Sequence, residues 1–181
     1  MSAQAGGEVL RADGGDLPSL RHLSYGGGRM PRPIIEQTLR LLPEVDFVNG
    51  YGLTETTSSI AVLSPQDHRD AVTSTDPRVS RRLDSVGRPP PAVEIVVRDS
   101  DGAPVPAGSP GELWVRGPQV SGEYAHASQT EEGGWFRTLD ATVVTAADDA
   151  LPTPLRHLQP VLAPRDHDVE AAWAGGAATT R

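Results

Sequence analysis

Two glycines flank a tyrosine in the stretch VNGYGLTETTSS, and a glutamate follows among several hydroxyl side chains. Gly50 and Gly52 have no Cβ, so the backbone there can approach a planar group closely while the ring of Tyr51 stacks on it. The hydroxyl of Thr54 can contact a phosphate, and Glu55 offers the kind of carboxylate oxygen that Mg²⁺ takes together with phosphate oxygens. The alternative is that Thr54 caps a short helix and Glu55 is a surface acid in its first turn.

A second stretch, YGGGRMP, places Gly26–Gly28 after an apolar run and before a proline that suits a first helical turn. Bare backbone N–H groups and the positive end of a helix then face an anion, which is a general device for approaching a phosphate or a nucleotide. The alternative is that the triple glycine is only a flexible turn. A Walker-type loop is excluded because it requires a lysine, and all 16 basic residues are arginine.

The elements that position these stretches follow an α/β pattern. Residues 20–25 predict a strand, and an apolar face behind Pro31 and Pro33 predicts a helix of about ten residues that ends before Pro43. The run EVDFVNG predicts a second, buried strand. A right-handed crossover makes the two strands parallel neighbours, so both glycine stretches lie at the same edge of the sheet, where ligands of open α/β sheets bind.

The second half of the chain changes character. SPQDHRDAV predicts a short helix in which Ser64, Pro65 and Asp67 form the start signal. VEIVVRD and GELWVRG alternate around the turn SDG and predict an antiparallel hairpin. After Asp140 the pattern fades into a proline- and alanine-rich segment, which is also what a shifted reading frame would produce. The expected fold class is therefore a partial α/β sheet, a small antiparallel β subdomain and an irregular tail, divided as lead-in 1–16, nucleotide-binding α/β subdomain 17–84, β subdomain 85–140 and tail 141–181.

The composition excludes several classes of function. A net charge of −8 over 181 residues argues against a broad electrostatic attraction to nucleic acid. Without cysteine the chain has no disulfide, thiolate zinc site or cysteine nucleophile. No apolar run approaches the length of a membrane span, and no signal peptide is visible, so the expected location is the cytoplasm.

Four stretches in this order and at these spacings resemble the successive core motifs of the adenylate-forming, or AMP-binding, ligase superfamily: YGGGRMP, NGYGLTETTSS, GELWVRGPQVSGEY and GGWFRTLD. The resemblance covers about residues 17–140 and is closest to acyl-CoA synthetases of the fatty-acid–CoA ligase type. It implies that a carboxylic acid, such as a fatty acid, is activated with ATP and Mg²⁺ to an acyl-adenylate, with release of pyrophosphate from the ATP. The acyl group then passes to coenzyme A.

The resemblance also implies roles for individual residues. Thr54 would be a catalytic residue that contacts the phosphates, and Glu55 would be both a catalytic residue and the magnesium ligand. Asp140 falls where the family has an aspartate that binds both ribose hydroxyls. Gly27 and Gly28 would line the acyl and adenine pocket, and the residues bordering the adenine would be Asn49, Gly50, Tyr51 and Gly52. Trp114 and Arg116, in the region similar to the family's small β-barrel, are expected to be packing and surface residues.

Departures from the family pattern bear on activity. The family's lysine-bearing phosphate loop would precede these residues, and its C-terminal lysine domain would follow them. Leu139 replaces the usual glycine before the ribose aspartate and restricts the backbone there. The chain is therefore expected to be a ligase fragment, inactive alone because losing positioned cations removes most of the rate. Two alternatives stay open: a nucleotide-binding or split-enzyme half completed by a partner chain, and a non-catalytic interaction domain.

Overall fold

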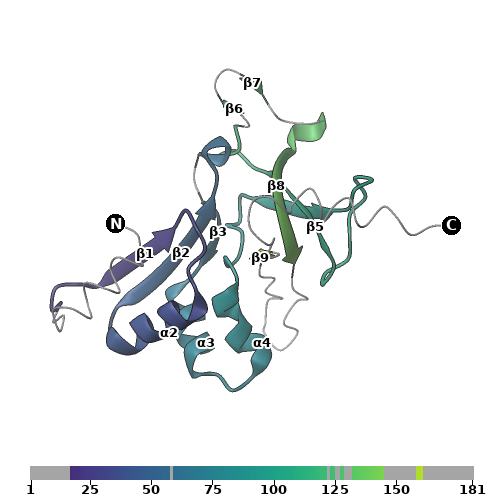
Figure 1. Cartoon of the computed structure of the whole chain (residues 1–181). Coiled ribbons are helices and arrows are strands. Elements are labelled where there is room, and N and C mark those ends of the chain that lie inside the picture. The colour runs from purple at the N-terminus through teal and green to yellow at the C-terminus, as the bar shows by residue number, and fades with distance from the viewer. Residues whose placement is uncertain are drawn as a thin grey trace.

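The computed structural model describes residues 17–57, 59–121, 123–124, 127–128, 132–144 and 158–160. Figure 1 shows two sheets beside each other, with the helices gathered at one end of the molecule. The first sheet has the order β1-β2-β3 and the second has the order β4-β5-β8-β9. Two short strands, β6 (Glu123–Tyr124) and β7 (Ala127–Ser128), form a separate ribbon. The predicted α/β class with a following antiparallel β part is confirmed.

The first sheet contains the predicted strand, helix, strand unit. Strand β1 (His22–Gly26) pairs in parallel with β2 (Asp46–Gly52), and α2 (Arg32–Leu41) connects them. Strand β1 begins two residues later than the sequence predicts. Strand β3 (Ser59–Leu63), which the sequence pattern did not predict, adds to β2 in the antiparallel sense.

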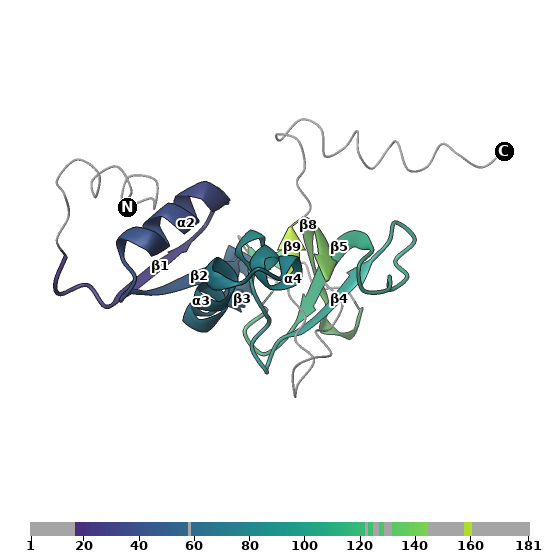
Figure 2. The same ribbon diagram turned by 90° about the horizontal axis from the view of Figure 1, so that it is seen from below.

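The helices cover one face of this sheet, as Figure 2 shows from below. In α2, Ile35 and Leu39 lie four residues apart on the buried face and pack with Phe47 of β2. The predicted helix α3 (Pro65–Thr73) begins as expected, because Ser64 and Asp67 exchange a reciprocal pair of bonds that forms a capping box. A short helix α4 (Pro77–Ser80) and two 3₁₀ turns, η1 (Thr54–Thr56) and η2 (Arg81–Asp84), complete this part.

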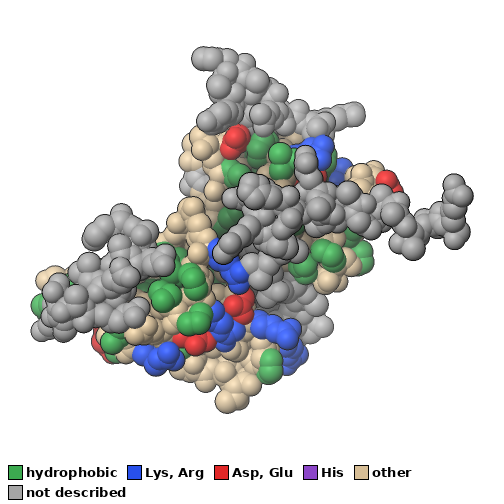
Figure 3. Space-filling model, viewed as in Figure 1, with side chains coloured by type: hydrophobic (Ala, Val, Ile, Leu, Met, Phe, Trp, Pro, Cys, Tyr) green, Lys and Arg blue, Asp and Glu red, His purple; other side chains and the backbone are tan. Residues whose placement is uncertain are grey.

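Charged side chains tie the helices together, and Figure 3 shows arginine and acidic groups beside each other at the lower edge of the molecule. Asp67 is 2% exposed and accepts a hydrogen bond of 2.6 Å from Arg88. Arg82 lies within ion-pair distance of the same carboxylate and of Asp70. These bonds fix η2 and the residues that follow it, so residues 83–86 are held at a defined place against the first sheet.

The second sheet consists of β4 (Glu94–Arg98), β5 (Pro110–Arg116), β8 (Phe136–Val144) and β9 (Leu158–Pro160), with the turn η3 (Glu132–Gly134) before β8. The predicted hairpin is confirmed as the antiparallel pair β4 and β5. The boundary predicted after Asp140 falls inside β8, whose Thr142 is 3% exposed. Most of the predicted tail, like the lead-in, lies outside the described residues.

The core of the second sheet extends into the first. Ile60 and Ala61 of β3 are fully buried in one cluster with Leu113 and Val115 of β5 and Phe136 of β8. The sequence assigned β3 and β5 to different subdomains, so this cluster crosses that boundary. Among the described residues, no helix is long and apolar enough to cross a lipid bilayer.

Candidate functional site

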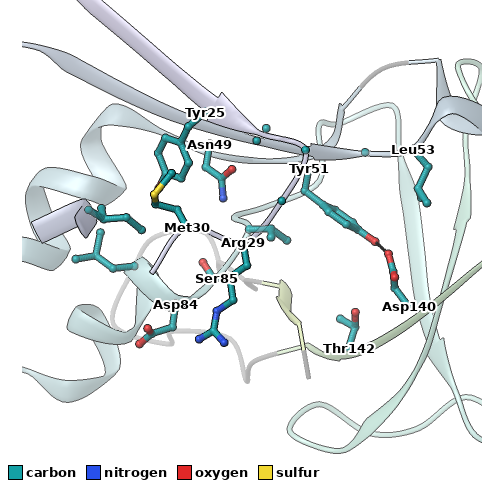
Figure 4. Close-up of a pocket in the computed structure, with 18 of the residues that line it drawn as sticks. Tyr25, Arg29, Met30, Asn49, Tyr51, Leu53, Asp84, Ser85, Asp140 and Thr142 are labelled. Atoms are coloured by element: carbon teal, nitrogen blue, oxygen red, sulfur yellow. Dashed lines mark hydrogen bonds between the residues drawn. The ribbon is translucent and has the colours of Figure 1, made fainter. Parts of the chain in front are cut away.

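A cavity of about 480 Å³ lies between the two sheets, a size typical of small-molecule sites. Apart from Ile35, its lining comes from four segments: 25–30, 49–53, 83–86 and 139–142. The first two segments are the ends of β1 and β2 with their glycines, the third is the end of η2 with the two residues after it, and the fourth is the middle of β8. Figure 4 shows how side chains from these separate parts of the chain point into one space.

Glycines at the ends of β1 and β2 let two backbones meet at the cavity wall. A Cβ at Gly26 would lie 2.3 Å from the carbonyl oxygen of Gly50, so only glycine permits this strand contact. Gly27 has a φ of 69°, in the left-handed region that glycine adopts without strain. A Cβ at Gly27 or Gly28 would meet nothing within 4 Å, which means that both residues border open space.

Tyr25 closes the apolar end of the cavity, and its hydroxyl group is held in place by His68. The Tyr25 hydroxyl lies 2.8 Å from Nε2 of His68, and Nδ1 of the same ring lies 2.8 Å from the carbonyl oxygen of Ser64. Because a carbonyl oxygen only accepts, Nδ1 carries the proton, and Nε2 accepts from Tyr25. Burial lowers the pKa of His68 and raises the pKa of Tyr25, so both groups are neutral.

Tyr51 and Asp140 meet at the other end of the cavity, 89 residues apart in sequence. The Tyr51 hydroxyl donates to Oδ2 of Asp140, as the dashed line in Figure 4 shows. The pKa of Tyr51 is raised, first because the side chain is buried and second because of this bond. One carboxylate oxygen is thereby occupied, and the other remains for a ligand.

Leu139, beside this aspartate, has a φ of 61° and a side chain that is 72% exposed. Left-handed backbone costs an L-residue with a Cβ about 1–2 kcal/mol. The leucine therefore holds a conformation that glycine would adopt more easily, and its apolar side chain lies at the cavity wall.

Thr54 and Glu55 lie in η1, outside the lining of the cavity. Thr54 is exposed, and the fully buried Thr56, not Thr54, bonds the backbone of Leu53 at the start of the turn. The carbonyl oxygen of Glu55 accepts a hydrogen bond of 3.1 Å from the Ser121 hydroxyl, which fixes the backbone below its half-buried side chain. Within the described ranges, no group of three or more His, Asp and Glu side chains could hold a metal ion by itself.

The structure thus divides the residues predicted for the site. One cavity brings together Gly27, Gly28, Asn49, Gly50, Tyr51, Gly52 and Asp140. Thr54 and Glu55 stand apart on the turn that follows β2. Sequence reasoning missed Tyr25, Arg29 and residues 83–86 as cavity residues. The adjacency of Tyr25 and Arg29 to the glycines was a usable signal, whereas nothing in the sequence places residues 83–86 there.

Comparisons with known proteins agree on one family. A family model described as "AMP-binding enzyme" matches residues 2–125, more than half of the chain. A 4-coumarate–CoA ligase-like protein of Arabidopsis thaliana is 34% identical over 74% of this chain and 23% of its own length. A long-chain-fatty-acid–CoA ligase of Yersinia pestis is 35% identical over 69% of this chain and 21% of its own length. The chain spans about a fifth to a quarter of these relatives.

Solved structures give the same result. The amide bond synthetase McbA of Marinactinospora thermotolerans matches with a TM-score of 0.66 and 31% identity, over 87% of this chain and 29% of that one. The o-succinylbenzoate coenzyme A synthetase MenE of Bacillus subtilis, solved with ATP and magnesium ion, matches with a TM-score of 0.63 and 25% identity, over 84% and 28%. On the family match, the fold and the ordered motifs together, the chain belongs to the AMP-binding enzyme family.

Proposed function

We propose that the chain forms part of the nucleotide- and acid-binding site of an AMP-forming acid–CoA ligase. In that reaction a carboxylate attacks the α-phosphorus of ATP and pyrophosphate leaves; the thiol of coenzyme A then attacks the acyl carbon of the acyl-adenylate, and AMP leaves. The observation that carries the proposal is the cavity, in which the glycine ends of β1 and β2 face Tyr51 and Asp140. It combines open backbone, an aromatic ring and a carboxylate, which are the parts that a nucleoside requires.

Each part has a defined task in the proposed complex. The adenine would lie along Gly50–Gly52 with Tyr51 on its face and Asn49 at its edge, opposite Gly27 and Gly28. The free oxygen of Asp140 would accept a ribose hydroxyl. The carboxylic acid would occupy the remaining, more apolar part of the cavity, near Tyr25.

The phosphates of the bound nucleotide would extend from the cavity toward η1, where the Thr54 hydroxyl can donate to them and Glu55 can bind Mg²⁺. This fits the chemistry of the ion, which is commonly held by one or two carboxylates and completed by phosphate oxygens and water. When bound, Mg²⁺ would neutralise charge on the phosphates. Glu55 is suited to this task because its backbone is anchored through Ser121 and its side chain is half-buried.

The proposed role is binding rather than complete catalysis. Charge develops at the α-phosphate in the adenylation step, and removing even one positioned donor from such a site typically slows a reaction about 10²- to 10³-fold. The 181 residues contain no lysine. Any lysine of the site would come from outside these residues, whether from further chain or from a partner. The proposed setting is the cytoplasm, where ATP and coenzyme A are at hand, with residues 17–84 supplying most of the nucleotide site and Asp140 its ribose contact.

Calorimetric titration with AMP tests the proposal. The wild-type chain should bind AMP, and Asp140→Ala should weaken the binding about 10- to 100-fold because a charge-assisted bond to the ribose is lost. Asp101→Ala is the matched control, since Asp101 is an exposed acid in the β4–β5 turn. If the wild-type chain fails to bind AMP at millimolar concentration, or if Asp140→Ala binds as well as wild type, the proposal is wrong.

The chain alone should show no ATP–pyrophosphate exchange with a panel of carboxylic acids. If the chain does catalyse this exchange, and if Glu55→Ala abolishes it, the proposal that the chain only binds the nucleotide is wrong. It would show that the cations of this site come from the arginines of the chain itself.

A further inference from the structure

Arg29 is a charged residue of the cavity to which neither the family motifs nor the proposed mechanism gives a task. It follows the triple glycine and precedes α2 by two residues. In Figure 4 its side chain extends from the glycine loop across the cavity toward the segment that carries Asp84 and Ser85. The two other charged residues of the lining, Asp84 and Asp140, are both acidic.

Both acidic groups already have partners. Asp84 accepts a hydrogen bond of 2.8 Å from Arg32, which also binds Glu36 at 2.7 Å. Asp140 accepts from the Tyr51 hydroxyl. Arg29, by contrast, makes no hydrogen bond and no ion pair with any residue that the structure describes. Arg29 is exposed at the cavity, and none of its five N–H donors is taken by a described residue.

The glycine loop and the start of α2, on either side of Arg29, favour the binding of a negatively charged group. Gly27 and Gly28 border open space and add no side chain that would fill it. Helix α2 begins next to this loop at Pro31, which supplies no side-chain cap to neutralise the positive end of the helix. A planar guanidinium binds the two oxygens of a carboxylate or phosphate in parallel, so this corner of the cavity matches an oxyanion.

We infer that Arg29 binds the anionic oxygens of the ligand, a phosphate or carboxylate group, and supplies the cavity with the cation that a lysine-free chain otherwise lacks. The inference rests on the proposed function for the choice of ligand. It goes further in naming a residue that selects charged ligands over neutral analogues. The shared chemistry is an oxyanion, and the two sources, nucleotide phosphate and acid carboxylate, are separated by experiment.

Two pairs of probes isolate the charge: AMP against adenosine, and octanoate against octanamide. Calorimetric titration of the full chain should show that wild type prefers the charged member of at least one pair. Arg29→Gln should reduce that preference about 10- to 100-fold while leaving the neutral member's affinity unchanged. Arg29→Lys should retain part of the preference because the charge stays while the bidentate geometry is lost.

Arg40→Gln is the matched control. It removes the same charge from the exposed last turn of α2, away from the cavity, and should leave both preferences as in wild type. Because Arg29 has no partner among the described residues, Arg29→Gln should also unfold at the wild-type temperature, which a thermal melt verifies.

The outcomes separate the claims. Loss of the AMP preference identifies phosphate as the source, and loss of the octanoate preference identifies the carboxylate. If Arg29→Gln keeps both preferences, or weakens adenosine as much as AMP, the inference is wrong while the proposed nucleotide site stands. If wild type binds neither AMP nor adenosine, the proposed function fails and the inference fails with it.

Discussion

At the scale of single residues, His68 is the most constrained group near the cavity. It is fully buried, its Nδ1 donates to Ser64 and its Nε2 accepts from Tyr25. A protonated ring could still donate from Nε2 to the Tyr25 oxygen, but it would place a positive charge in a fully buried site, which desolvation disfavours. The site behind Tyr25 therefore favours a neutral histidine.

This predicts a pH dependence of stability. The pKa of His68 is lowered in the folded state from an ordinary value of 6.5, so below that pH the unfolded chain binds more protons than the folded one. The stabilisation is present above pH 6.5 and is lost as the pH falls, by up to about 1.4 kcal/mol per pH unit. Urea unfolding between pH 7.5 and 5.5 measures the slope.

His68→Gln is the comparison variant, since an amide can accept from Tyr25 and does not titrate in this range. Its free energy of unfolding should change less over the same interval, whatever its absolute value. Equal slopes for the two proteins would show that His68 does not carry the dependence.

Sequence reasoning could identify Tyr51 because the glycines around it mark a close backbone approach. It could not identify the Tyr25–His68 pair, because its two members are 43 residues apart and nothing in the sequence around His68 points to Tyr25. The expectation that Leu139 restricts the backbone could be drawn from the sequence because φ is a local property. Leu139 has a positive φ, which glycine adopts without strain.

At the scale of elements, the contact between β1 and β2 at the cavity wall requires the glycine at position 26 but not the glycine two residues later, at position 28. Gly26→Ala should lower the free energy of unfolding by about 1–3 kcal/mol, because the new Cβ would lie 2.3 Å from the Gly50 carbonyl oxygen and the strands must move apart. Gly28→Ala, with nothing within 4 Å of its Cβ, should change stability by less than about 0.5 kcal/mol.

Chemical denaturation of the two variants beside wild type decides this. Equal effects of both substitutions would mean that the strands are not in close contact at Gly26.

Helices α2 and α3 were predictable because their start signals and apolar spacing are local. Strand β3 was not, because SIAVL is a short apolar run that follows the 3₁₀ turn at Thr54–Thr56 without a glycine or proline to mark its start. Pairing with β2, together with full burial of Ile60, Ala61 and Leu63, makes it a strand.

At the scale of the whole molecule, the two sheets share one core through β3. This makes residues 85–140 an incomplete unit, since they would expose the pocket that Ile60 and Ala61 fill. Trypsin can cut at the exposed Arg81 in η2, close to the boundary predicted after residue 84. The two pieces produced by such a cut should co-elute in native size exclusion and separate in urea.

A stable fragment beginning after Arg81 that elutes alone would instead favour an independent β domain. The shared core was not predictable from the sequence, because a switch from helical to β patterning marks a change of element type and says nothing about which side chains later fill the same core.

The bond between Tyr51 and Asp140 joins β2 of one sheet to β8 of the other. A ribose hydroxyl on the other oxygen of that carboxylate would leave this bond in place. The protein's own bond would already hold Asp140 where the sugar meets it, so the carboxylate would lose little conformational freedom on binding. The two sheets would thus be joined before the ligand arrives, and a bound nucleoside would add a second link between them.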